Sequence, residues 1–83
     1  MPAKPAPAAP PAPAAVRLSP RESTCLHWAA AGKTSWETGR ILEISESTVN
    51  FHLRNASRKL QVRGRRAAVA AAIRRGLLHP VTA

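Results

Sequence analysis

A helix-start motif that occurs twice constrains the possible folds of the chain more than any other feature of its sequence. Ser19 is followed three residues later by Glu22, and Thr34 is followed in the same way by Glu37. In such a capping box the hydroxyl accepts from the third N–H of the helix, while the carboxylate accepts from the N–H of the capping residue. Two helices are therefore predicted, over residues 20–31 and 35–42.

Two more helices are predicted after the second capping box. Ser45 is a favoured capping residue, and Glu46 places negative charge in the positively polarised first turn that follows it. The run RRAAVAAAIRRG has high helix propensity and ends on a glycine, which is a common helix stop. The chain is therefore expected to be all-α, with four helices over residues 20–31, 35–42, 46–60 and 65–75. Ile41 and Leu42 are the expected inward side chains of the second helix.

The third of these helices has two unlike faces. At about 100° per residue, one stripe is apolar and is expected to face the core. This stripe contains Val49, Leu53, Ala56 and Leu60. The opposite stripe contains Ser47, Phe51, Arg54 and Arg58. A buried helix would not place charge there, and an ordinary solvated helix gains nothing from an exposed phenylalanine, so this stripe is expected to meet a partner.

The chain is short and strongly basic. Its 83 residues hold one small domain, with poor room for an enclosed catalytic cavity, because such a domain buries only about 60% of its surface on folding. No spacing of base, nucleophile and orienting partner suggests an enzyme. The net charge of +9 and the pI of about 11.8 favour polyanions such as nucleic acid or an anionic membrane surface.

The N-terminal segment differs in composition from the rest. Residues 1–15 are almost wholly proline and alanine, so they can neither form hydrogen-bonded ladders nor bury a core. A disordered arm is therefore expected over residues 1–16 and a folded domain over residues 17–79. The arm does not resemble a signal peptide, and no apolar run approaches the roughly 18 residues of a membrane span. A cytoplasmic protein without membrane contact is expected.

Cysteine and histidine usage gives no sign of a metal site. Cys25 has no second cysteine to pair with, and the three histidines are too far apart for metal-ligand spacing. Neither a metal nor another cofactor is expected.

The order of elements indicates nucleic-acid binding. A short helix, a tight turn over residues 43–45 and a longer basic helix form the plan of a helix-turn-helix, whose second helix enters the major groove of DNA. All four acidic residues lie between Glu22 and Glu46, whereas Arg54 to Arg75 contains eight basic residues and no acidic one. The later half is therefore the positive end of the domain.

Several motifs together resemble the DNA-binding domain of LuxR-type (LuxR/FixJ) bacterial transcription regulators. They are LSPRE, GKTSWE, ISESTVNFH, RKL and RAAVAAAIRRGLL, and the resemblance covers about residues 17–79. GKTSWE and TVNFHLRNA are most similar to the acyl-homoserine-lactone receptors of quorum sensing. The resemblance implies a four-helix LuxR-type helix-turn-helix domain that binds DNA and regulates transcription.

The chain also departs from the family pattern. Thr38 and Gly39 stand where the family usually has Ile and Ala, which removes buried methyl groups and adds a glycine that costs about 1 kcal/mol against alanine in a helix. Glu43 occupies a turn position often held by Gly or Asn, and Gly64 replaces a usual Ser, Thr or Asn cap. Low stability is expected. No sensor domain accompanies the resemblance, and the Pro/Ala-rich segment takes its place.

The resemblance implies which residues would contact DNA. Asn50, Phe51 and Arg54 match the positions that face base edges, where Arg can bridge guanine acceptors, Asn can pair with adenine and Phe can touch a thymine methyl. Phe51 could instead contact a dimer partner, and all three could be plain surface residues. Phosphate contacts are expected from residues at helix starts and groove flanks: Lys33, Thr34, Ser35, Ser45, Ser47, Thr48, Arg58 and Lys59. Thr34 and Ser45 are helix caps as well.

The fourth helix is the expected dimer contact, because the corresponding helix commonly pairs in the family. Its apolar stripe of Ala68, Val69, Ala72 and Ile73 would face the core. The residues expected at the dimer interface are Ala67, Ala70, Ala71 and Arg74. A two-fold dimer would read two half-sites about one helical turn apart. The alternative is a solvated face that simply has high helix propensity.

The hypothesis is therefore a small dimeric transcription regulator that binds double-stranded DNA specifically, with residues 46–60 in the major groove. The alternative is an interaction module without a sensor that dimerises with a full-length LuxR-type regulator and modulates it. Nonspecific binding through charge alone is a third reading. Candidate protein partners are a second copy, a full-length LuxR-type regulator and RNA polymerase.

Overall fold

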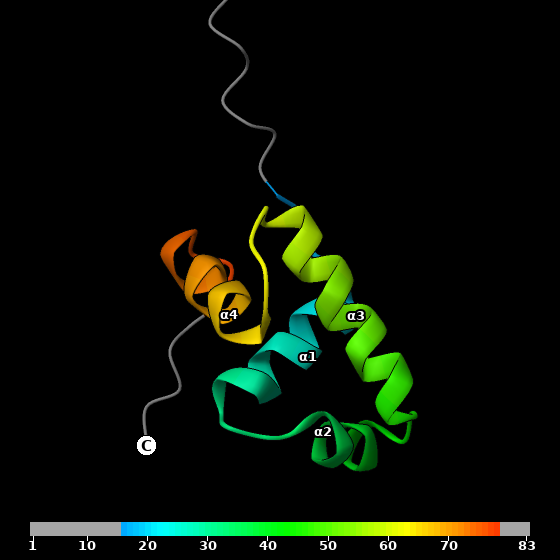
Figure 1. Cartoon of the computed structure of the whole chain (residues 1–83). Coiled ribbons are helices and arrows are strands. Elements are labelled where there is room, and N and C mark those ends of the chain that lie inside the picture. The colour runs from blue at the N-terminus through cyan, green and yellow to red at the C-terminus, as the bar shows by residue number, and fades with distance from the viewer. Residues whose placement is uncertain (1–15, 79–83) are drawn as a thin grey trace, which may run out of the picture.

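The computed structural model describes residues 16–78 (Figure 1). Four helices make up this part of the chain: α1 (Pro20–Ala30), α2 (Ser35–Leu42), α3 (Glu46–Lys59) and α4 (Arg65–Arg74). The predicted all-α fold is confirmed, and each helix agrees with its predicted bounds to within one residue. No strand occurs among residues 16–78. The arm expected over residues 1–16 lies outside the described residues, apart from its last position.

Both predicted capping boxes are present. At the start of α1, the Ser19 amide donates to Glu22 Oε1 at 2.8 Å and the Glu22 amide donates to Ser19 Oγ at 3.1 Å. At the start of α2, the corresponding distances between Thr34 and Glu37 are 2.9 and 3.0 Å. The direction of entry into the first two helices is therefore set locally, as the sequence pattern predicts.

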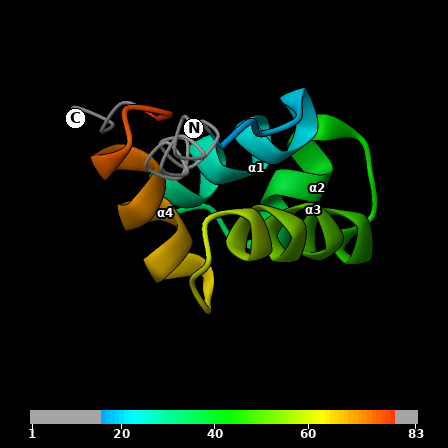
Figure 2. The same cartoon turned by 90° about the horizontal axis from the view of Figure 1, so that it is seen from above.

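One apolar core joins the helices. α1 packs on all three other helices, and so does α3, whereas α2 and α4 lie on opposite sides and do not pack on each other (Figures 1 and 2). The centre of the core is formed by fully buried side chains from α1, α3 and α4: Cys25, Leu26, Val49, Ala56, Ala68 and Ala72. The arrangement leaves one side of α3 uncovered along its length.

The folded part begins one residue earlier than predicted. Val16 was expected in the arm, but it is half-buried and packs against the core together with Leu18. At the other end of the described chain, Leu78 is buried.

The prediction for the inward side of α2 is wrong for Ile41. Thr38 and Gly39 are buried and Leu42 is half-buried against the core, whereas Ile41 is 44% exposed. The buried side of α2 is centred between Thr38, Gly39 and Leu42, and Ile41 lies about 100° around the helix from that centre.

Gly39 has a packing role that the sequence did not reveal. A Cβ atom at this position would lie 2.6 Å from the carbonyl oxygen of Ile44, because the chain folds back over the end of α2. The Ile44 amide also donates to the Gly39 carbonyl at 2.9 Å. The glycine therefore permits a close backbone approach, and its cost in helix propensity is only part of its effect on stability.

Two other unusual positions follow from backbone geometry. Glu43 ends α2 in the left-handed region, with φ 60° and ψ 43°, which explains why Gly or Asn is favoured at such a turn. Gly64 precedes α4 with φ 94° and no side-chain cap. With Arg65 and Arg66 next to it, the start of α4 combines uncapped amides with positive charge.

Candidate nucleic-acid interface

The two predicted faces of α3 are confirmed. Val49, Leu53 and Ala56 are buried on one side, while Asn50 and Arg54 are exposed on the other. Phe51 is 54% exposed, and its ring packs edge-on against His52 at a centroid distance of 5.7 Å. Ser45 caps α3 by accepting from the Thr48 amide at 3.0 Å. Neither Phe51 nor Arg54 is covered by another described helix.

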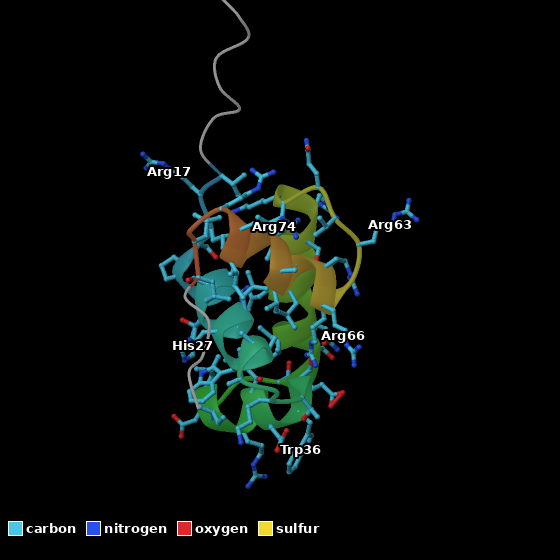
Figure 3. All side chains as sticks on the ribbon, turned by 90° about the vertical axis from the view of Figure 1, so that its left-hand side faces the viewer. Arg17, His27, Trp36, Arg63, Arg66 and Arg74 are labelled. Atoms are coloured by element: carbon cyan, nitrogen blue, oxygen red, sulfur yellow. The ribbon has the colours of Figure 1, made fainter. Side chains whose placement is uncertain are left out.

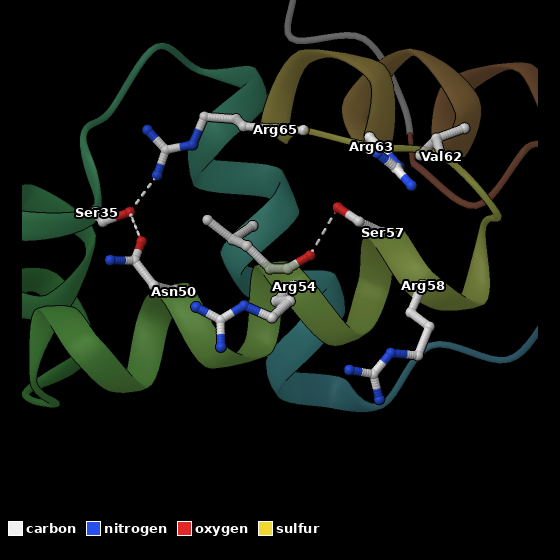
Figure 4. Close-up of a pocket in the computed structure, with 10 residues that line it drawn as sticks. Ser35, Asn50, Arg54, Ser57, Arg58, Val62, Arg63 and Arg65 are labelled. Atoms are coloured by element: carbon white, nitrogen blue, oxygen red, sulfur yellow. Dashed lines mark hydrogen bonds between the residues drawn. The ribbon is translucent and has the colours of Figure 1, made fainter.

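A basic groove runs beside this face of α3 (Figure 4). Its volume is about 790 Å³, and its walls come from the start of α2, the outer side of α3, the loop after α3 and the start of α4. The polar and charged side chains that line it are Ser35, Asn50, Arg54, Ser57, Arg58, Arg63 and Arg65. Four arginines on one concave surface create a strong local preference for anions.

A chain of hydrogen bonds crosses this groove. The Arg65 guanidinium donates to Ser35 Oγ, and Ser35 Oγ donates to Asn50 Oδ1 at 2.5 Å (Figure 4). These three side chains come from three different helices. Asn50 is therefore exposed to solvent but held on one side by the protein.

Lys59 makes structural contacts that the sequence did not predict. Its ammonium lies 2.8 Å from Glu22 Oε1 and donates to the Arg17 carbonyl at 3.1 Å. This is the single ion pair among residues 16–78. Because Glu22 is buried, the ammonium neutralises a carboxylate of the fold, which engages the cation that the sequence predicts at a DNA phosphate.

The same contacts explain the acidity of Glu22. Burial acts to raise the pKa of its carboxyl, but the hydrogen bonds from Lys59 and Ser19 outweigh burial and hold the pKa below its ordinary value of 4.5. Glu22 is thus a charged group inside the domain, paired with the end of α3.

The other residues predicted to contact DNA phosphates lie at two helix starts and in the groove. Lys33, Thr34 and Ser35 surround the first turn of α2, and Ser45, Ser47 and Thr48 surround that of α3. Thr34 and Ser45 are caps in the structure, and the Ser35 hydroxyl is engaged with Asn50 and Arg65. The groups that remain available to donate to a phosphate at these helix starts are therefore largely the backbone amides of the first turns. Arg58 is exposed and lines the groove.

The predicted dimer residues of α4 do not share one surface. Ala70 and Arg74 are exposed and Ala67 is half-buried, but Ala71 is 2% exposed and belongs to the core. The prediction for Ala71 is wrong. The stripe predicted to face the core, Ala68, Val69, Ala72 and Ile73, packs there, but the five alanines among the ten residues of α4 gave no signal that Ala71 also faces inward.

Sequence reasoning missed two basic groove residues. Arg63 and Arg65 line the groove from the loop and from the first turn of α4. Figure 3 shows Arg63 and Arg66 extending toward the same side of the molecule. The cluster of arginines around Gly64 was the available signal, but its position beside α3 depends on the packing of α4.

Two further observations describe the surface. Trp36 is 59% exposed, and the Arg40 guanidinium lies 5.3 Å from the centroid of its ring. None of the helices between residues 16 and 78 has the length and apolar content required to cross a bilayer.

Comparison with known proteins places this geometry in context. Residues 16–72 match the family model described as "Bacterial regulatory proteins, luxR family". The chain is 56% identical over 63 residues to the quorum sensing-dependent transcriptional regulator RpaR of Rhodopseudomonas palustris, covering 76% of this chain and 26% of RpaR. It is 46% identical over 61 residues to the transcriptional activator LuxR of Aliivibrio fischeri, covering 74% of this chain and 24% of LuxR.

A solved structure shows the same fold. The transcription factor GerE superimposes with a TM-score of 0.73 at 31% sequence identity, and the match covers 77% of this chain and 96% of GerE. The chain thus corresponds to nearly all of that structure but spans only about a quarter of the length of RpaR and LuxR.

Proposed function

Because this chain belongs to the luxR family of bacterial regulatory proteins, we propose that it is a cytoplasmic transcription regulator that binds double-stranded DNA in a sequence-specific manner. The observation that carries the proposal is the exposed outer face of α3, beside a groove lined by arginines. An α-helix with its side chains is about 10–12 Å across, which fits the major groove of B-DNA at about 12 Å.

Base reading is assigned to Asn50, Phe51 and Arg54. Each is exposed on the same side of α3, and none is needed for the core. Arg54 offers a planar fork of donors for guanine, and a good bidentate contact discriminates against a wrong base by about 1–3 kcal/mol. These residues would select the sequence.

Phosphate binding is assigned to Arg58, to Lys33 and to the amides and hydroxyls at the starts of α2 and α3. Such contacts position the protein but read no sequence, so they should weaken together as salt rises. Arg63 and Arg65 add positive charge to the same groove.

Dimerisation is assigned to the outer face of α4, formed by Ala67, Ala70 and Arg74. Small side chains there allow a second copy to approach closely. A two-fold dimer would place two copies of α3 at half-sites about one helical turn apart.

The test compares two arginines one turn apart on α3. A duplex is first chosen by selecting bound sequences from a random pool, and fluorescence anisotropy then measures binding to it and to a scrambled duplex. Arg54→Ala should remove discrimination between the duplexes, whereas Arg58→Ala should weaken both equally and reduce the salt slope by about 1. Equal weakening by Arg54→Ala would contradict its role.

Two results would reject the proposal as a whole. If the wild-type protein shows no sequence preference at any salt concentration, its binding is nonspecific and driven by charge. If its DNA affinity never exceeds the nonspecific level while it binds a full-length relative, the chain is an interaction module.

A further inference from the structure

Three side chains from three helices form one hydrogen-bonded unit across the groove. Ser35 is the first residue of α2, Asn50 lies on α3, and Arg65 is the first residue of α4. α2 and α4 do not pack on each other, so the Arg65–Ser35 hydrogen bond joins them across the groove through side chains alone. Ser35 in turn contacts Asn50 (Figure 4).

The direction of these bonds follows from the chemistry of the groups. A guanidinium has only donors, so Ser35 Oγ accepts from Arg65 and keeps its own hydrogen to donate. The 2.5 Å separation of Ser35 Oγ and Asn50 Oδ1 lies in the range of O–H···O bonds and below that of N–H···O bonds. Asn50 therefore directs its carbonyl oxygen at Ser35 and its amide nitrogen away.

The charged donor strengthens the second bond. A hydroxyl that accepts from a cation is polarised, which makes its hydrogen a better donor to the next acceptor. Arg65 thus acts on Asn50 through Ser35, although it does not contact Asn50 itself.

We propose that Ser35 and Arg65 are positioning residues that lock the side-chain amide of Asn50 and thereby set its base preference. A free asparagine on a helix surface can rotate its amide and present either the oxygen or the nitrogen. With Oδ1 engaged by Ser35, Asn50 presents its N–H donors in one fixed direction, toward acceptors such as the N7 atom of a purine. The inference rests on the proposed DNA binding through α3.

This assignment separates two roles that Ser35 could have. A hydroxyl that contacts phosphate would contribute equally to every duplex. A hydroxyl that orients Asn50 would contribute only at the base pair that Asn50 faces, and only while Asn50 is present.

The test is a double-mutant cycle measured on four duplexes. The duplexes differ only at the base pair where Asn50→Ala relaxes selection. Ser35→Ala should lower discrimination at this pair by about 5- to 10-fold, within the range of a single base contact. In the Asn50→Ala background, the same substitution should change discrimination less than twofold, because residues of one hydrogen-bonded unit are not additive.

Ser35→Thr provides the rescue, since threonine keeps the hydroxyl at this position and should retain discrimination. Thr34, not Ser35, caps α2, so Ser35→Ala is expected to fold normally, and thermal unfolding followed by circular dichroism checks this.

Arg65→Met and Arg66→Met form a matched pair at the start of α4. Each removes one positive charge, but Arg65 is the one that donates to Ser35. Both should weaken binding to all four duplexes, and Arg65→Met alone should also lower discrimination at the Asn50 base pair.

The possible outcomes separate this inference from the proposed function. Specific wild-type binding combined with a uniform effect of Ser35→Ala, additive with Asn50→Ala, would overturn the positioning role and leave the proposed function standing. Absence of any wild-type sequence preference would reject both.

Discussion

Replacing Lys59 with methionine should destabilise the domain while leaving DNA affinity intact. The substitution keeps most of the aliphatic stem but removes the ammonium that bonds Glu22 at 2.8 Å and the Arg17 carbonyl at 3.1 Å. Glu22 would then be a buried carboxylate without its cationic partner, still accepting a hydrogen bond from the Ser19 amide. The fold would lose the ion pair between α1 and the end of α3, while the apolar packing of the two helices remains.

The size of this effect depends on how well water can replace the ammonium. Breaking a fully buried ion pair costs about 3–5 kcal/mol, and a hydrogen bond to a charged group contributes about 1.5–3 kcal/mol. The Lys59 side chain is 42% exposed and that of Glu22 6% exposed, so solvent screens one partner but hardly reaches the other. We expect a loss of about 1–2 kcal/mol, a substantial part of the roughly 3–9 kcal/mol typical of a domain of this size.

The loss should also depend on pH in a defined direction. The pKa of Glu22 lies below 4.5 in the folded protein, so the pairing stabilises the fold above that pH and is lost as the pH falls through the folded-state pKa. Urea unfolding should therefore separate wild type from Lys59→Met at about pH 7, and the difference between the two should shrink as the pH falls through the folded-state pKa of Glu22.

The adjacent arginine is the matched control. Arg58→Met removes a cation from the groove wall, where it forms no ion pair among residues 16–78. Its stability should stay within about 0.5 kcal/mol of wild type while its DNA affinity falls. If Lys59→Met instead retained full stability and lost affinity as Arg58→Met does, the stabilising role of the Lys59–Glu22 pair would be refuted.

Three further substitutions test other parts of the structure. Glu43→Gly should stabilise the domain by about 1 kcal/mol, because glycine adopts the left-handed conformation at the end of α2 without strain, and an unchanged or lower melting temperature would contradict this. Gly39→Ala should destabilise by about 1 kcal/mol in urea unfolding despite alanine's helix propensity, since its Cβ would meet the Ile44 carbonyl at 2.6 Å; a gain in stability would show that the turn can move aside. Ala70→Glu should reduce binding to a duplex with two half-sites but not to a single half-site, and sedimentation should show loss of the dimer; equal binding losses on both duplexes would count against pairing through α4.

Local signals in the sequence predicted the helices well. The capping boxes at Ser19 and Thr34 involve residues only three positions apart, so their geometry is determined by the chain nearby. The two faces of α3 were predictable for the same reason, because large apolar residues and arginines separate clearly on a helix of known period. Phe51 and Arg54 are exposed as that pattern required.

Features that depend on distant residues could not be predicted in this way. Lys59 and Glu22 are 37 positions apart, and nothing near Lys59 indicates that its charge is used inside the fold. Ser35 meets Arg65 only because α4 returns beside α3. Ala71 was assigned to the wrong side because alanine fits either face of a helix, so the width of the buried side of α4 is decided by the partners that pack on it.

The bond from Lys59 to the Arg17 carbonyl has a mechanical consequence. It ties the point where the backbone enters the domain to the last turn of α3, at the end remote from α2 (Figure 1). A linker attached ahead of residue 16 would therefore pull on α3 at the end remote from α2. Tension on such a linker would reach α3 directly, without first passing through the turn between α2 and α3.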